Sequence, residues 1–101
     1  MHRQATAFVH RNALFLAQYS TVWNSPASSP GGVANEHHWL LGYYKALHPH
    51  ASGHAYQNYI DASLKNWQSA YYGVNYKRLT QVKATYDPHQ LLKFPQSIQP
   101  A

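Results

Sequence analysis

The chain has 101 residues, which is enough for one modest domain and too few for two. Eight lysines and arginines against three acidic residues give a net charge of +5, yet only 11% of the residues are charged and 15% are aromatic. An ordinary soluble domain has about 25% charged residues, so we expect other protein to cover part of this surface. The absence of cysteine excludes disulfides and thiolate metal sites.

The sequence predicts no membrane span, because no apolar run approaches the length that a bilayer requires. The first residues, Met1 to Gln4, lead into an apolar stretch that His10, Arg11 and Asn12 interrupt, which does not resemble a signal peptide. The sequence therefore indicates no particular compartment.

The first half of the chain predicts a strand, a loop and a helix. Residues 5–23 are rich in β-branched and aromatic side chains that alternate imperfectly, as expected for one long strand, or two with a bend near Asn12, partly buried on both faces. Residues 24–32 (NSPASSPGG) have the composition of a loop. A helix is predicted over about residues 35–47, where apolar side chains recur at three- and four-residue steps before Pro49: Trp39, Leu40, Tyr43, Tyr44 and Leu47.

The second half predicts short elements. Residues 48–54 form a turn-rich connector and residues 55–60 a short extended segment. A short helix around Trp67 to Tyr71 ends at Gly73, and Asn75 caps a second helix that ends at Asp87. Its apolar stripe, expected to face a core, is Leu79, Val82 and Tyr86. The tail after this helix is expected to be irregular, and the predicted fold class is α+β.

Two other kinds of site were weighed and set aside. His48, His50 and His54 could converge in their loop, but the chain has no cysteine and its acids are remote in sequence, so solvated or hydrogen-bonding histidines are the favoured interpretation and no metal site is predicted. The basic aromatic stretch 71–83 has the composition of a nucleic-acid contact, but no binding-fold signature accompanies it. Its cations are expected to form the solvated side of a helix.

Tyrosines around Asn58 are the remaining chemical feature. A phenol can donate a hydrogen bond, or act as a base if its pKa of about 10 is lowered by nearby cations or donors. On the residues alone, core or interface tyrosines stay the simpler interpretation.

Residues 55–98 resemble the carboxy-terminal segment of FAD-linked oxidases of the berberine bridge enzyme family. Ordered matches to that segment run along the whole stretch: Tyr56-Gln57-Asn58-Tyr59, Asp61, Trp67, Tyr71-Tyr72-Gly73, Asn75, Arg78-Leu79, Val82-Lys83, Tyr86-Asp87-Pro88 and Phe94-Pro95-Gln96-Ser97-Ile98. Residues 1–54 resemble a remnant of the preceding strand, loop and helix of the substrate domain, and residues 55–101 the carboxy-terminal segment, so the domain set is incomplete.

This resemblance implies roles for three residues. Asn58 contacts the flavin, Tyr59 lies at the substrate side as the candidate catalytic base, and Tyr56 lines the same pocket as a second catalytic and cofactor-binding candidate. In a regular strand Tyr56 and Asn58 share one face and Tyr59 the other, so both tyrosines reach one flavin only from an irregular backbone. Asp61 is the only nearby acid.

The resemblance also implies an activity: hydride transfer from a substrate C–H, of an alcohol or sugar, to FAD. The amino-terminal FAD-binding domain of the family is missing here, so we expect the isolated chain neither to retain FAD nor to be active alone, and that domain, FAD and a small substrate to be its partners. Nucleic acid and membrane are not expected as partners. The competing hypothesis is a non-enzymatic remnant or a small interaction protein.

Overall fold

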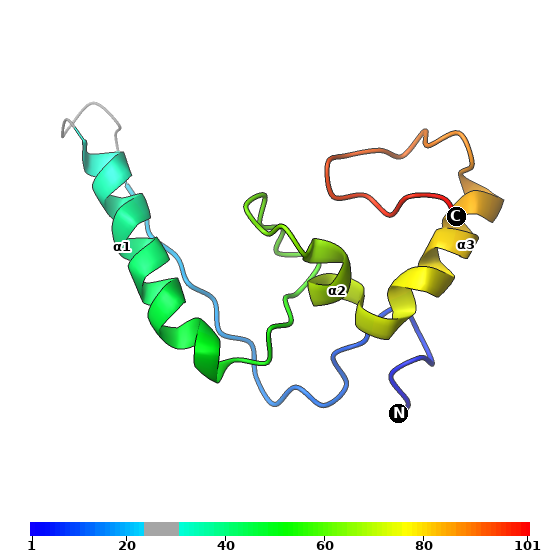
Figure 1. The fold of residues 1–101 in the computed structure, drawn as a ribbon, viewed down its shortest axis with the longest axis horizontal. Helices are drawn as coiled ribbons and strands as arrows, with labels where there is room; N and C mark the ends of the chain where they lie inside the picture. Colours follow the sequence, from blue (N-terminus) through cyan, green and yellow to red (C-terminus); the bar gives the residue numbers. More distant parts are fainter. Residues whose placement is uncertain (24–30) are drawn as a thin grey trace. The chain divides into compact units, whose positions relative to one another are not determined.

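The computed structural model describes residues 1–23 and 31–101 and divides the chain into two compact units. One unit joins residues 1–14 to 54–101, and the other comprises residues 15–53. The described residues form three α-helices, α1 (Gly32–Leu47), α2 (Trp67–Tyr72) and α3 (Tyr76–Tyr86), and two short 3-10 helices, η2 (His48–His50) and η3 (Gly73–Asn75) (Figure 1). The predicted assignment of residues 1–54 to a remnant of the substrate domain and of residues 55–101 to the carboxy-terminal segment stays a prediction.

The predicted α+β class is wrong for the part of the chain that the structure describes, because no strand is found there. Residues 3–12 contain turns, including an Arg11 N–H bond to the Val9 carbonyl, where a strand was expected. Residues 13–23 contain no turn, but no neighbouring strand among the described residues forms backbone hydrogen bonds with them. A segment is a β-strand only where such a neighbour accepts and donates its backbone hydrogen bonds. The loop predicted at residues 24–32 lies mostly outside the described residues.

In the unit of residues 15–53, residues 15–23 run along α1 (Figure 1). The Tyr19 ring packs edge-on against Tyr43, with ring centroids 5.3 Å apart, and the Thr21 hydroxyl donates a hydrogen bond to the Glu36 carboxylate. Tyr19 and Thr21, two residues apart, thus both contact α1. The backbone groups of a helix are already hydrogen-bonded to one another, so α1 cannot pair with this segment as a strand would. The alternation of apolar residues in 15–23 therefore arises from packing against a helix and does not indicate a strand in a sheet.

Helix α1 confirms the predicted helix and begins three residues earlier. It follows Gly31, whose φ of 79° lies in the left-handed region that glycine adopts without strain. The helix ends at Leu47, and Pro49 follows in η2. None of its residues is fully buried.

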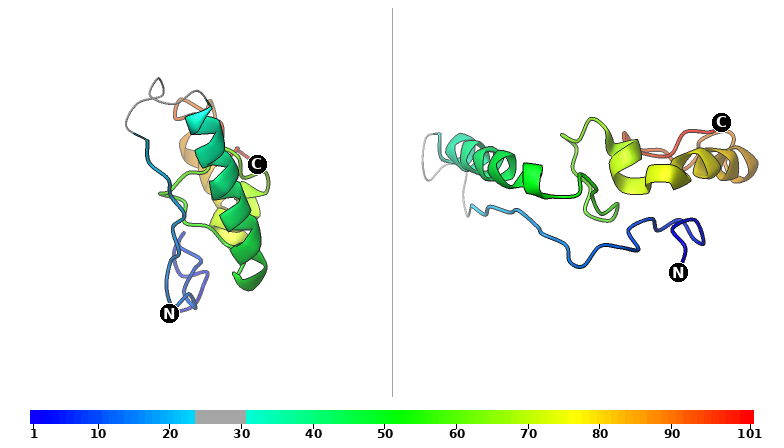
Figure 2. Two further views of the ribbon diagram at one scale, coloured as in Figure 1. Left: turned by 90° about the vertical axis from the view of Figure 1, so that its left-hand side faces the viewer. Right: turned by 60° about the horizontal axis from the view of Figure 1, so that its bottom comes forward.

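In the other unit, α2, η3 and α3 follow one another, and the carboxy-terminal tail lies back along α3 (Figures 1 and 2). Helix α2 ends at Gly73, as predicted, where a Cβ would lie 3.3 Å from the Val9 side chain at a φ of 48°. The irregular tail is also confirmed, and its last backbone N–H, from Ala101, bonds to the Thr80 carbonyl.

Helix α3 has the predicted bounds, but two details differ. Asn75 stands at the N-cap position without making a side-chain cap bond; its buried amide donates to the backbone carbonyls of residues 3, 6 and 7. The predicted stripe does not face a core, since Leu79 is half-buried, Val82 is exposed and Tyr86 is 83% exposed. The small core consists of Val9, Ala70 and Tyr71.

Candidate functional site

The three predicted site residues lie on one turn. Residues 55–60, predicted to be extended, fold back so that the Tyr59 N–H donates to the Tyr56 carbonyl over 3.0 Å. Because of this turn, the two rings face each other edge-to-face with centroids 5.3 Å apart. The Asn58 side-chain amide donates to the Tyr56 hydroxyl oxygen at 2.9 Å. The extended conformation predicted here is therefore wrong, and the irregular backbone that brings the two tyrosines together is present.

Helix α2 fixes the start of this turn. The Ala55 N–H donates to the Ala70 carbonyl over 2.9 Å, and Ala70 is buried. Tyr56 is half-buried, whereas Asn58 is exposed and Tyr59 is 56% exposed. The turn thus presents the Tyr59 ring to whatever adjoins this face, while its base is anchored.

A closed hydrogen-bond network holds the chain just after the turn. The buried Tyr71 hydroxyl accepts from the Asp61 N–H at 2.9 Å and donates to the Gln96 side-chain oxygen at 3.1 Å. The Gln96 amide in turn donates to the Asp61 carbonyl at 2.7 Å. The Asp61 carboxylate accepts from the N–H and hydroxyl of Ser63, so it shapes a local turn. Tyr71 and Gln96 match the family pattern, but nothing in the residue spacing indicated that they would meet.

Five rings in successive contact form an aromatic row that includes the two tyrosines of the turn. Its members are His54, His10, Phe8, Tyr56 and Tyr59. Phe8 packs edge-on against Tyr56, with centroids 6.2 Å apart, and against His10 at 5.2 Å. His10 lies 5.4 Å from His54. The Arg11 guanidinium stands 5.1 Å from the Phe8 ring centre. Sequence reasoning assigned none of these residues to the site, because only the tertiary structure brings residues 8–11 beside residues 54–59.

The charge state of His10 follows from this packing. Burial lowers the pKa of His10 below its ordinary value, the charge of nearby His54 lowers it further, and the backbone of Tyr71 and Ala55 opposes the shift. Arg3 adds a smaller lowering of the same pKa. Together these effects favour the neutral form of His10.

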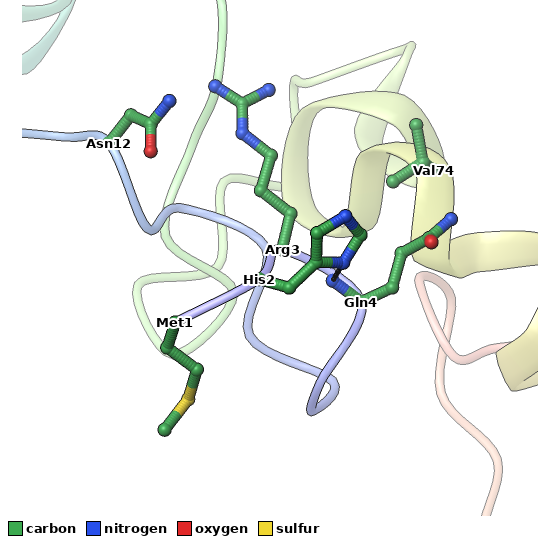
Figure 3. A pocket seen from close by; sticks show the side chains of 6 residues that line it. All are labelled: Met1, His2, Arg3, Gln4, Asn12 and Val74. Atoms are coloured by element: carbon green, nitrogen blue, oxygen red, sulfur yellow. Dashed lines mark hydrogen bonds between the residues drawn. The ribbon is translucent and has the colours of Figure 1, made fainter.

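The described pockets do not enclose the turn. An open depression of about 480 Å³ lies at the amino terminus, where the His2 ring accepts a bond from the Gln4 N–H at 3.3 Å (Figure 3). It is lined by Met1, His2, Arg3, Gln4, Asn12 and Val74. A buried flavin needs a walled, largely apolar pocket, and the turn supplies at most one face of it.

The structure also bears on metals and membranes. Among residues 1–23 and 31–101, no group of three or more histidine, aspartate or glutamate side chains is placed to hold a metal ion. His54 contacts His10 and belongs to a different unit from His48 and His50, the two histidines with which it could have converged. None of the described helices has the length and apolarity that crossing a bilayer requires.

The exposed turn suits contact with a flat heteroaromatic group. It offers two aromatic rings and an amide that is already oriented by the Tyr56 hydroxyl. Aromatic faces stack on planar rings, and amide groups bond to ring nitrogens and carbonyls. The residues present are therefore chemically compatible with one side of a flavin ring.

Comparison with known proteins identifies the class. Residues 55–99 match the family described as "Berberine and berberine like". The chain is 39% identical over 95 residues to an uncharacterized FAD-linked oxidoreductase, YgaK, of Bacillus subtilis, with 94% of this chain and 20% of that protein covered. It is 31% identical to reticuline oxidase of Papaver somniferum (94% and 22%) and 35% identical to chitooligosaccharide oxidase of Gibberella zeae (94% and 20%). No solved structure matches the chain.

The chain is therefore homologous to FAD-linked oxidoreductases. It belongs to the berberine bridge enzyme family and corresponds to its carboxy-terminal domain. It spans about a fifth of the length of the relatives named above.

Proposed function

We propose that this chain supplies the flavin-facing and substrate-facing turn of an FAD-linked oxidase. The observation that carries this proposal is the turn at residues 56–59, which brings Tyr56 and Tyr59 to a centroid distance of 5.3 Å with Asn58 bonded to Tyr56. A family motif that needs both tyrosines at one cofactor requires such a turn.

Each residue has a distinct proposed role. Tyr59, the more exposed ring, acts as the base in its phenolate form and becomes a phenol when it takes up the substrate hydroxyl proton. Asn58 contacts the cofactor, and its bond to the Tyr56 hydroxyl holds Tyr56 as the side of the same pocket. Bound FAD supplies the hydride acceptor. Other protein must exclude water, since the turn is open in this chain.

The proposed substrate is an alcohol or a sugar. Proton removal by a phenolate assists oxidation only where the substrate carries a hydroxyl on the carbon whose C–H loses hydride. One relative is named for a chitooligosaccharide, which supports a saccharide.

A chimera tests the proposal. The matching carboxy-terminal part of the Gibberella zeae oxidase is replaced by this chain, and flavin reduction by a chitooligosaccharide is followed anaerobically. Tyr59→Phe, which keeps the ring, should slow reduction by at least about 10²-fold, the lower range of general-base assistance. Tyr56→Phe should slow it less, and Asn58→Ala should change the flavin spectrum or content.

Two controls make the result decisive. Tyr86→Phe alters an 83% exposed tyrosine on α3 and should leave the rate unchanged. A chimera carrying the matching part of the Bacillus subtilis YgaK protein tests whether a foreign segment is accepted at all. If that chimera reduces its flavin and the one with this chain does not, the non-enzymatic hypothesis prevails. If Tyr59→Phe reduces flavin at the parent rate, Tyr59 is not the base.

A further inference from the structure

The aromatic row links the site to a histidine pair that no proposed role yet uses. From Tyr59 the row runs through Tyr56 and Phe8 to His10 and His54, with successive centroids 5.3, 6.2, 5.2 and 5.4 Å apart. Phe8 is the only member of the row that touches both Tyr56 and His10. Any displacement of His10 therefore reaches Tyr56 through one ring.

The backbone on both sides of Phe8 and His10 is fixed. Val9, between them, is 4% exposed, and its side chain fills the space beside Gly73. The Asn75 amide donates to the Ala7 and Thr6 carbonyls at 3.3 and 3.0 Å. With the backbone held, the orientation of the Phe8 ring depends on the rings that flank it.

His10 is the titratable ring in this packing. Its Nε2 atom is buried and has no hydrogen-bond partner among the described residues. The groups that face it are the His54 ring and the Ala55 backbone from the turn segment, the Tyr71 backbone from α2, and Arg3 from its own segment, while Arg11 stands over Phe8. The two backbone groups favour a proton on His10, but none of these groups is a carboxylate, so the proton adds a charge near Arg3 and inside an apolar contact.

We propose that neutral His10 is a positioning residue that, wedged against His54, holds Phe8 against Tyr56, and that its protonation releases this contact and disorders the site. The inference rests on the proposed function for its effect on flavin reduction, but not for the ring movement itself. Misplacement of a site by about 1 Å can cost about 10²-fold in rate. Flavin reduction should accordingly fall by up to about 10²-fold as His10 becomes protonated below its ordinary pKa range.

Fluorine NMR of the full chain measures the ring movement directly. With 4-fluorophenylalanine at position 8, the fluorine shift should change in one step as the pH is lowered, with its midpoint below the ordinary histidine pKa of about 6.5. His10→Phe keeps a ring in place and should abolish the step, whereas His10→Ala should shift the resonance at every pH. His89→Phe removes an exposed histidine and should leave the step unchanged.

The chimera supplies the second readout. Its flavin reduction should show an acidic loss with the midpoint of the fluorine step, and His10→Phe should restore the acidic rate. A step that persists in His10→Phe, or a His10→Ala resonance identical to the parent's, overturns the inference. A chimera with this chain that never reduces flavin, where the YgaK chimera does, overturns the proposed function alone, since the fluorine step is measured without it.

Discussion

The hydroxyl of Tyr71 is the most informative single group to remove. It is bonded on both sides, to the Asp61 N–H at 2.9 Å and to the Gln96 side chain at 3.1 Å, and its residue is 2% exposed. Tyr71→Phe keeps the packing of the ring and deletes the hydroxyl. The oxygen of the buried Gln96 side chain and the N–H of the more exposed Asp61 then each lose a partner.

The cost can be estimated from this geometry. A buried donor or acceptor left without a partner costs about 1–3 kcal/mol, which corresponds to about 5- to 150-fold in an equilibrium constant. Because the segment that carries Asp61 follows the tyrosine turn directly, this loss should appear as local opening of residues 59–64.

Amide hydrogen exchange of the full chain measures that opening. Protection of the Asp61 N–H should fall by about 5- to 150-fold in Tyr71→Phe. Tyr72→Phe, which removes the hydroxyl of the neighbouring half-buried ring, should leave Asp61 protection within error. Unchanged protection in Tyr71→Phe, or an equal loss in Tyr72→Phe, would refute the reasoning.

Three further predictions concern stability, charge and the isolated chain. Leu79→Ala should lower the thermal midpoint of the chimera by less than a fully buried leucine would, since Leu79 is half-buried in a groove with residues 4–7, whereas exposed Lys77→Ala should leave it unchanged. The hydrogen bond from Lys83, with the Leu92 and Leu91 amides, lowers the pKa of Asp87, so the carboxylate contributes stability above its unfolded pKa that is lost as pH falls through its folded pKa. Leu91 amide protection should fall with pH in the parent below about pH 4, but stay uniformly low in Asp87→Asn. The purified chain should bind the dye ANS through exposed side chains such as Leu14, Phe15 and Leu92, and should carry no flavin; stoichiometric flavin after gel filtration would contradict this.

Local patterns in the sequence predicted the helices well because each depends on neighbours in the chain. Apolar spacing located α1, and Gly73 and Asp87 marked the ends of α2 and α3. Gly73 ends α2 at the expected position because glycine adopts a positive φ without strain, a preference that can be read from the residue type alone. The ordered motif of residues 55–98 likewise identified the family without any structure, as the match to residues 55–99 confirms.

Tertiary contacts decided the features that the sequence left wrong or unassigned. Residues 5–23 have the composition of a strand, but pairing depends on a neighbour, and a helix lies beside residues 19–21. Asn75 occupies the cap position, but its side-chain amide donates hydrogen bonds to three backbone carbonyls of residues 3–7 instead of capping the helix. The Tyr71 network and the aromatic row join residues that are remote in sequence. The tyrosine turn is local, but it folds back where the β-propensity of its residues favours an extended segment. Such contacts depend on which surfaces meet after the chain folds, and no periodicity in the sequence records them.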